Sequence, residues 1–235
     1  MAIQTVFLDA GGVLVYPNWV RVSETLGRYG VLVSDAVLRS AEPHAKKRID
    51  SGETIHATND QQRGWTYFNL VLERAGVTLS GATDAALAEL HAYHQEHNLW
   101  ETVGGDVRPA LAALRSLGVR LVVVSNANGT LHRAFARLGI FDAFDAVFDS
   151  SDEGVEKPDP RFFQIALERT ASAAATTVHV GDLYHVDVVG ARRAGLQAIL
   201  LDEADLYRDY DCPRVRSVTD LVAAVGVLTK QGEHV

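Results

Sequence analysis

Acidic, basic and hydroxyl side chains spread along the whole chain have the types needed to handle a phosphoryl group. They are Asp9, Ser125, Lys157, Asp182 and Asp187. A carboxylate can attack phosphorus and form an aspartyl-phosphate. Several acidic residues together make a hard-oxygen site suited to Mg²⁺. A lysine and a hydroxyl can neutralise and hold phosphoryl oxygens as charge moves. The residue types indicate phosphoryl chemistry if the fold brings them together.

Each of these residues also has a simpler structural interpretation. A carboxylate before Gly11 and Gly12 can cap a turn, and a Ser-Asn pair after a strand is usually a turn or a helix cap. Lys157 precedes a proline, where a solvated loop residue is typical, and Asp187 could cap a helix. The chemical interpretation depends on all four segments occurring in order at the ends of alternating strands.

The elements that must position these residues alternate between strand and helix. Residues 3–8 form an apolar run typical of a buried parallel strand, which ends at Asp9. Alternating units predict a parallel sheet with right-handed crossovers, in which ligands gather at the carboxyl ends of the strands. The further strands are expected at residues 120–124, 146–148, 177–180 and 197–201 and near 215; helices are expected at 106–117, after 129, from 160, at 186–194 and at 217–227. Asp106 is expected to cap the first of these helices.

Between the first strand and the rest lies a stretch with no convincing strand. The apolar periodicity within residues 17–100 predicts amphipathic helices near 18–29, 34–49, 59–74 and 83–97. These helices are separated by Gly30, Gly52, Gly76 and Gly81. We therefore expect two domains: an α/β core from residues 1–16 and 101–235, and a helical cap from residues 17–100. Residues 15–18 and 103–105 would connect them, the second flexible enough to act as a hinge.

Composition narrows the class of protein. The chain has 235 residues, 47% of them hydrophobic and 22% charged, and a formal net charge of −8. Without a long basic run, nucleic acid and anionic membrane are not expected as partners. The single cysteine, Cys212, excludes an intrachain disulfide and a thiolate metal site. No apolar stretch is long enough to span a bilayer and no signal sequence precedes the first strand, so a cytoplasmic enzyme is expected, as a monomer or a homodimer.

The motifs in this order resemble the haloacid dehalogenase (HAD) superfamily, in the group with a helical cap inserted after the first motif. The matching residues are 9–14, 124–126, 156–159 and 181–187, and 188–195 resemble the continuation of the last motif. The resemblance covers almost the whole chain and implies a Rossmann-like α/β core in three layers, α/β/α. It also implies a hydrolase, most often a Mg²⁺-dependent phosphatase of a small phosphorylated metabolite.

The resemblance implies a role for each motif residue. Asp9 would be the nucleophile and a Mg²⁺ ligand, and the carbonyl of Gly11 a further ligand. Asp182 would bind Mg²⁺ directly, while Asp187 would bind it or orient its waters.

The remaining motif residues are implied to contact the phosphoryl group. Ser125 would bind it, helped by the amide of Asn126. Lys157 would balance the negative charge of the nucleophile and of the phosphate.

The sequence departs from the family pattern at two positions. Gly11 stands where family phosphatases carry a second Asp that protonates the leaving oxygen and then activates water, and Val13 stands in place of the usual Thr. General acid–base help is typically worth about 10²–10⁴-fold in rate. A phosphohydrolase could replace it with water or with a cap residue such as His44, Lys47 or His56, and would favour good leaving groups.

Two other hypotheses remain open. One is a dehalogenase, which needs no metal, or a phosphonatase, which would use a cap lysine, Lys46 or Lys47, for a Schiff base. The other is a binding or regulatory module that keeps the phosphate and Mg²⁺ sites without turnover.

Three further groups of residues are expected to be structural. His91, His94 and His97 could place imidazoles on one helical face, but a solvated face is expected. His179, in a strand beside the site, is expected to be a hydrogen-bonded buried histidine. The tryptophans are expected mainly in cap packing: Trp19, Trp65 and Trp100.

Overall fold

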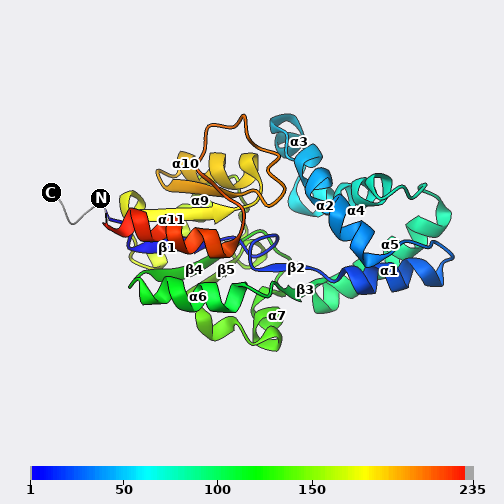
Figure 1. Cartoon of the computed structure of the whole chain (residues 1–235), viewed down its shortest axis with the longest axis horizontal. Helices are drawn as coiled ribbons and strands as arrows, with labels where there is room; N and C mark the ends of the chain where they lie inside the picture. The colour runs from blue at the N-terminus through cyan, green and yellow to red at the C-terminus, as the bar shows by residue number, and fades with distance from the viewer. Residues whose placement is uncertain (1, 231–235) are drawn as a thin grey trace. The chain divides into compact units, whose positions relative to one another are not determined.

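The computed structural model describes residues 2–230, except the side chains of residues 56, 61 and 65. The side chains of His56 and Trp65, named above, therefore lie outside the described residues. The chain divides into two compact units (Figure 1). One contains the residues up to Tyr16 and those from Val103 onward, and is called the α/β unit below. The other is Pro17–Thr102, called the helical unit.

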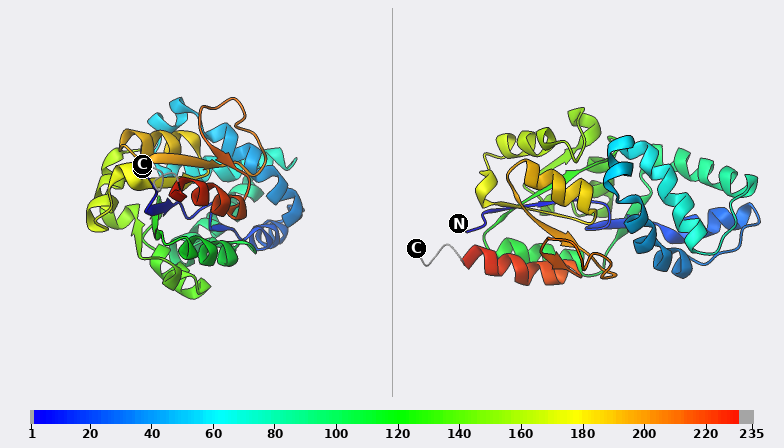
Figure 2. Two further views of the ribbon diagram at one scale, coloured as in Figure 1. Left: turned by 60° about the vertical axis from the view of Figure 1, so that its left-hand side comes forward. Right: turned by 90° about the horizontal axis from the view of Figure 1, so that it is seen from above.

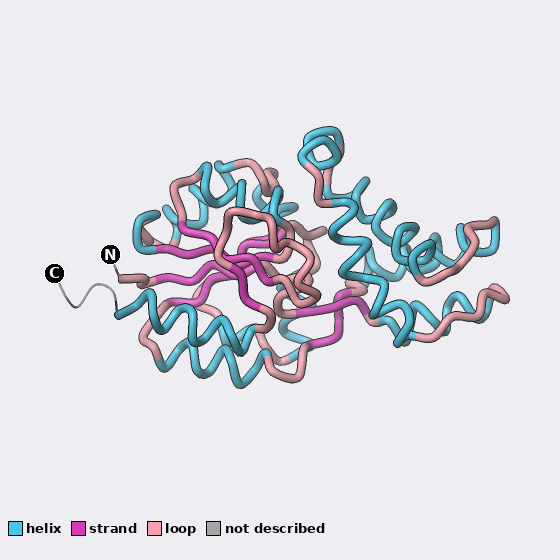
Figure 3. The backbone as a smooth tube through the Cα atoms, turned by 45° about the horizontal axis from the view of Figure 1, so that its top comes forward, coloured by secondary structure: helices cyan, strands magenta, loops and turns pink. Residues whose placement is uncertain are grey.

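The α/β unit is built on a six-stranded parallel sheet in the order β5-β4-β1-β6-β7-β8. Figure 3 shows these strands running side by side between helices. The central strand β1 pairs with β4 and β6, and all four of its side chains are buried, as an apolar strand covered on both faces requires. The strands are β1 (Thr5–Leu8), β4 (Arg120–Ser125), β5 (Ala146–Asp149), β6 (Thr177–Gly181), β7 (Gln197–Leu201) and β8 (Arg214–Val215).

Helices cover both faces of this sheet, which confirms the predicted α/β class (Figures 1 and 2). On one face, α9 (Pro160–Arg169), the π-helical turn η3 (Tyr184–Val188) and α10 (Val189–Arg193) pack in one apolar cluster with Phe7. On the other face lie α6 (Val107–Ser116) and α11 (Val218–Lys230), which contact each other. The shorter elements are α7 (Leu131–Leu138), η1 (Phe141–Ala143), α8 (Ser150–Glu153) and η2 (Ala174–Thr176).

The helix starts differ in one respect from expectation. Asp159 caps α9, because its side chain accepts a hydrogen bond from the backbone N–H of Arg161 and Pro160 fills the first helical position. Asp106 occupies the predicted N-cap position of α6, but its side chain makes no capping hydrogen bond. Its carboxylate instead accepts a hydrogen bond from the hydroxyl of Thr219 at 3.3 Å, which ties the start of α6 to α11.

The helical unit contains the four predicted helices and one more. They are α1 (Trp19–Arg28), α2 (Asp35–Ile49), α3 (Gly52–Ala57), α4 (Asp60–Arg74) and α5 (Gly81–His97). The short helix α3 was not expected, because Gly52 was interpreted as a break. Gly52 and Gly81 instead begin helices, since Ser51 and Ser80 before them accept hydrogen bonds from backbone N–H groups of the first turn.

Two short strands mark the points where the chain passes between the units. β2 (Val15–Pro17) and β3 (Trp100–Val103) form a two-stranded sheet. The connections were expected at residues 15–18 and 103–105, with no strand assigned to either of them. Segments of three and four residues are too short for alternation to distinguish a strand from a loop, so only the pairing reveals them. No helix in the described part of the chain is both long and apolar enough to cross a bilayer.

The described tryptophans pack inside the helical unit, as expected. Trp19 is 1% exposed and donates a hydrogen bond from its indole N–H to Glu42 at 2.9 Å. Trp100 packs edge-on against Phe68, with ring centroids 5.9 Å apart.

His94 corrects the expectation of a solvated histidine face. Its Nδ1 accepts a hydrogen bond from the backbone N–H of Leu99 at 3.1 Å, and its ring lies 5.3 Å from that of Trp100. Burial, and next the charge of His91, lower the pKa of His94 to about 4. The side chain therefore caps the end of α5 as a neutral imidazole.

This burial predicts an acid-dependent loss of stability. Below pH 6.5 the unfolded chain gains a proton at His94 that the folded chain does not take up until about pH 4. The free energy of unfolding should therefore fall by about 2 to 3 kcal/mol between these pH values through this residue alone. His94→Asn keeps an acceptor near Nδ1 but cannot titrate. Urea unfolding of both proteins at pH 7 and pH 4.5 checks this; an equal loss in both would contradict it.

Candidate active site

The motif residues meet at the carboxyl edge of the sheet. Asp9 directly follows β1, and its backbone N–H donates to the carbonyl of Val180 in β6 at 2.8 Å. Ser125 is the last residue of β4, and Asp182 directly follows β6. The neighbouring segments supply Lys157, from the loop between α8 and α9, and Asp187, from η3.

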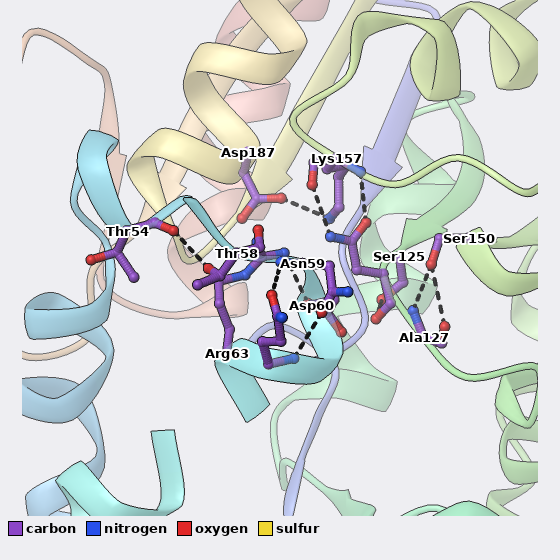
Figure 4. A network of polar contacts seen from close by, with 12 residues as sticks. Thr54, Thr58, Asn59, Asp60, Arg63, Ser125, Ala127, Ser150, Lys157 and Asp187 are labelled. Carbon is purple, nitrogen blue, oxygen red and sulfur yellow. Dashed lines mark hydrogen bonds and ion pairs between the residues drawn. The ribbon is translucent and has the colours of Figure 1, made fainter. Parts of the chain in front are cut away.

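Lys157 lies at the centre of this site. Its side chain is 1% exposed, and its Nζ lies 2.9 Å from Oδ1 of Asp9 and 2.7 Å from Oδ1 of Asp187. Figure 4 shows the ammonium and the carboxylate of Asp187 facing each other. Burial would lower the pKa of Lys157, but the two carboxylates outweigh it and raise the pKa. The interpretation of Lys157 as a solvated loop residue is wrong, since it is a permanent buried cation.

The carboxylate of Asp9 is held but retains access to solvent. Its side chain is 14% exposed, and Oδ1 accepts hydrogen bonds from Lys157 and from the backbone N–H of Ala10 at 2.8 Å. Burial raises the pKa of Asp9 despite the lowering by Lys157, and the charge of Asp187 raises it further. Two carboxylates thus share one cation, and Ser125 adds a hydrogen bond to Asp9.

Asp187 lies closer to the Lys157 ammonium than Asp9 does, at 2.7 Å against 2.9 Å. Its Oδ1 accepts from Lys157 and from Nε2 of His179 at 3.0 Å, and its Oδ2 accepts from the backbone N–H of Leu183 at 3.0 Å. Burial would raise the pKa of Asp187, but Lys157 and His179 lower it well below its usual range. The hydrogen bond to Leu183 spans the turn η3 from within it, so Asp187 is not the N-cap residue that the simpler interpretation expected.

His179 supports Asp187 from inside the sheet. It is fully buried, and burial lowers its pKa, so the imidazole is neutral and its Nε2–H donates to Asp187. Its ring packs edge-on against Phe163 at 4.9 Å. The expectation of a hydrogen-bonded buried histidine is confirmed for Nε2, whereas Nδ1 has no hydrogen-bond partner within residues 2–230 as described.

Gly181 makes room for this carboxylate. A Cβ added to it would overlap the Cβ and the carboxyl group of Asp187. The glycine before Asp182 is therefore required by close approach of a side chain six residues later, and no positive φ is involved.

Three carboxylates form the acidic part of the site. Asp9, Asp182 and Asp187 each offer an oxygen within 4.8 Å of the other two. Asp182 and Asp187 are also buried, and hard oxygens brought this close suit Mg²⁺. The donor set thus fits the ion that the motifs imply, while a role for the Gly11 carbonyl stays a prediction.

Three side chains that the sequence did not single out for this purpose make hydrogen bonds that order the loop after β4. The side-chain amide of Asn126 donates from Nδ2 to the carbonyl of Lys157 at 3.0 Å, and its Oδ1 accepts from the N–H of Lys157 at 2.8 Å. Asp149, at the end of β5, accepts from the N–H of Gly129 at 3.0 Å. Ser150 donates to and accepts from the backbone of Ala127 (Figure 4). Nothing local in the sequence marks these pairs, because their partners are 20 residues or more away.

The fold and the site define a Rossmann-like α/β protein with an acidic cluster and a buried lysine at the sheet edge. A family model for haloacid dehalogenase-like hydrolases matches residues 3–195. The chain belongs to this family, and the resemblance seen in its motifs is confirmed.

The chain is similar in sequence to curated members of this family. It is 35% identical over 151 residues to the zebrafish haloacid dehalogenase-like hydrolase domain-containing protein 3, covering 62% of this chain and 60% of the relative. The corresponding mouse protein is 33% identical, over 54% of this chain and 50% of its own length. The matches thus span between half and two thirds of these relatives. Glyceraldehyde 3-phosphate phosphatase of Methanopyrus kandleri is 30% identical over 66% of this chain and 71% of its own length.

Solved structures share the fold. The magnesium-bound HAD-hydrolase YfnB of Bacillus subtilis superposes with a TM-score of 0.70 at 16% identity, covering 96% of this chain and 99% of its own. The 2-haloacid dehalogenase of Pseudomonas syringae superposes with a TM-score of 0.58 at 25% identity, covering 94% and 98% of the two chains.

Gly181→Ala tests the packing of the acidic cluster. The added methyl group overlaps Asp187, so the carboxylate must leave its partners. We expect the free energy of unfolding to fall by about 2 to 4 kcal/mol, measured by urea denaturation. Gly27→Ala is the control, because a Cβ there meets nothing within 4 Å and a helical alanine is favourable. Equal stability of the Gly181 variant and wild type would show that Asp187 is not confined.

Proposed function

We propose that the chain is a phosphohydrolase that uses Asp9 as nucleophile on a small phosphorylated substrate. The observation that carries the proposal is the Lys157 ammonium, buried between Asp9 and Asp187 beside the hydroxyl of Ser125. Relatives named glyceraldehyde 3-phosphate phosphatase and ribulose-1,5-bisphosphate 5-phosphatase support a phosphorylated metabolite as substrate.

The proposed reaction has two displacements at phosphorus. A carboxylate oxygen of Asp9 bonds to phosphorus while the bond to the leaving oxygen breaks and that oxygen keeps the electron pair. Water then attacks the aspartyl-phosphate, which releases phosphate and restores the Asp9 carboxylate. Lys157 holds Asp9 in place and offsets negative charge, and the Ser125 hydroxyl with the Asn126 backbone N–H donates to phosphoryl oxygens.

Asp9, Asp182, Asp187 and the Gly11 carbonyl are the groups that would hold Mg²⁺. Bound among them, the ion would supply positive charge against the phosphoryl oxygens. The fit rests on the three carboxylate oxygens that approach one another within 4.8 Å.

Gly11 limits the substrates that this site would serve well. It has no side chain to protonate the leaving oxygen, so phosphates whose leaving groups need no proton are favoured. Acyl phosphates and aryl phosphates meet that requirement. Water would then assist the second step in place of the missing carboxylate.

Dehalogenation is the alternative that a specific observation favours, because a named 2-haloacid dehalogenase shares the fold at 25% identity. In that reaction Asp9 would attack carbon and halide would leave. The cluster of Asp9, Asp182 and Asp187 favours phosphate, because carbon–halogen displacement makes no use of three clustered carboxylates.

A panel of substrates tests the proposal. Acetyl phosphate, p-nitrophenyl phosphate, glyceraldehyde 3-phosphate and 2-chloropropionate are each assayed with Mg²⁺ and with EDTA, for wild type and for Asp9→Asn. We expect phosphate release that needs both Mg²⁺ and Asp9. Halide release that survives EDTA would establish the dehalogenase instead. Binding of phosphate without turnover above the Asp9→Asn background would establish a binding module.

Gly11→Asp tests the role of the missing acid. If proton supply limits turnover, the variant should hydrolyse alkyl phosphates roughly tenfold or more faster than wild type. Acetyl phosphate, whose leaving group needs no proton, should change much less. Steady-state phosphate release on both substrates measures the ratio, and an equal change on both would contradict the assignment.

A further inference from the structure

The side chain of Asn126 makes a reciprocal pair of hydrogen bonds with the backbone of Lys157. Nδ2 donates to the Lys157 carbonyl at 3.0 Å, and the Lys157 N–H donates to Oδ1 at 2.8 Å. The two residues are 31 positions apart, and the elements β5 and α8 separate them along the chain. A single side chain thus satisfies both polar groups of one peptide residue, much as a neighbouring strand would.

This pair joins two segments that both contribute to the candidate active site. Asn126 follows Ser125 directly, and Ser125 ends β4 beside Asp9. Lys157 lies outside any helix or strand, so no ladder of backbone hydrogen bonds places it. Its side chain is nevertheless fully buried and its ammonium contacts Asp9 at 2.9 Å.

A lysine placed by a loop needs its backbone fixed. The four-carbon stem is flexible, and an ammonium reaches a defined point only if its backbone and its surroundings are held. The surroundings are supplied by burial and by Asp187. The backbone is held by Asn126, and only an amide offers one donor and one acceptor at the spacing that a peptide N–H and C=O require.

We propose that Asn126 is a positioning residue, whose side chain fixes Lys157 against Ser125 and Asp9 and acts on the reaction only through Lys157. The proposal rests on the proposed phosphohydrolase function for its kinetic effect, but the pair of bonds itself does not. Asn126 differs in this from its neighbour Ala127, whose backbone is braced by Ser150 on the β5 side.

A double-mutant cycle on acetyl phosphate with Mg²⁺ tests this role. Asn126→Ala should lower kcat by about ten- to a hundredfold with little change in KM, because the nucleophile is still present but its cation is misplaced. In a Lys157→Met background the same change should have no further effect on kcat. If the effects of Asn126→Ala and Lys157→Met on kcat multiply in the double variant, the Asn126 side chain acts on substrate directly and the proposal is overturned.

Two companion variants separate positioning from general stability. Asn126→Asp keeps the acceptor for the Lys157 N–H but faces its carbonyl with a second oxygen, so it should lose kcat as Asn126→Ala does. Asn128→Ala is the matched control, because that side chain bonds the hydroxyl of Thr130 two residues away. It should retain wild-type kcat. If Asn126→Ala lowers the melting temperature but leaves kcat per folded enzyme unchanged, Asn126 has only a structural role and the proposal fails.

If Lys157→Met does not fold, inhibition constants replace the cycle. Orthovanadate resembles the transition state of phosphoryl transfer, whereas inorganic phosphate resembles the product. Asn126→Ala should weaken vanadate at least about tenfold more than phosphate. Equal weakening of both would contradict positioning.

Hydrogen exchange keeps this inference distinct from the proposed function. The amide of Lys157 should exchange faster in Asn126→Ala than in wild type or Asn128→Ala, whether or not the protein turns over any phosphate. Faster exchange in Asn126→Ala, found in a protein that turns over no phosphate, would support the role of Asn126 in holding Lys157 and would reject the phosphohydrolase. Phosphate turnover together with unchanged exchange of the Lys157 amide in Asn126→Ala would reject only the role of Asn126 in holding Lys157.

Discussion

One ammonium group buried between two carboxylates organises the site. Lys157 is cut off from solvent, and a buried charge of this kind is tolerable only when opposite charges contact it directly. Asp9 and Asp187 supply those charges, and both come from chain segments far from Lys157. The strands and turns that carry the three residues must therefore end at one place, and the structure of the sheet edge follows from that requirement.

The two carboxylates are treated unequally by their surroundings. Asp187 is buried and receives bonds from Lys157, His179 and a backbone N–H, which makes it a fixed anion. Asp9 keeps contact with solvent, and burial together with the nearby charge of Asp187 raises its pKa. One carboxylate is therefore suited to holding the cation in place, while the other has an oxygen left for chemistry. This division is what makes Asp9 the nucleophile in the proposed reaction.

Much of the site and the sheet could be predicted because the signals are local. The apolar run before Asp9, the β-branched run before Ser125 and the Gly181-Asp182 pair each mark a strand end, and parallel strands bring such ends to one edge. Where signals were short or ambiguous, prediction failed. β2 and β3 are too short to show alternation, and α3 begins at a glycine that was interpreted as a break. His94 is partly buried, although its spacing suggested a solvent-exposed face.

By itself the amino-acid sequence determined the α/β class, the family and the residues that meet at the sheet edge. Hydrophobic periodicity and each motif are patterns of neighbouring residues, and the order of the motifs is given directly by the sequence. Only the tertiary structure decided which atoms of those residues contact one another. That Asn126 bonds the backbone of Lys157, that Gly181 makes room for Asp187 and that His179 donates to the same carboxylate depend on segments brought together from different parts of the chain. Contacts between distant residues follow from how strands and turns pack, and no local pattern records that packing.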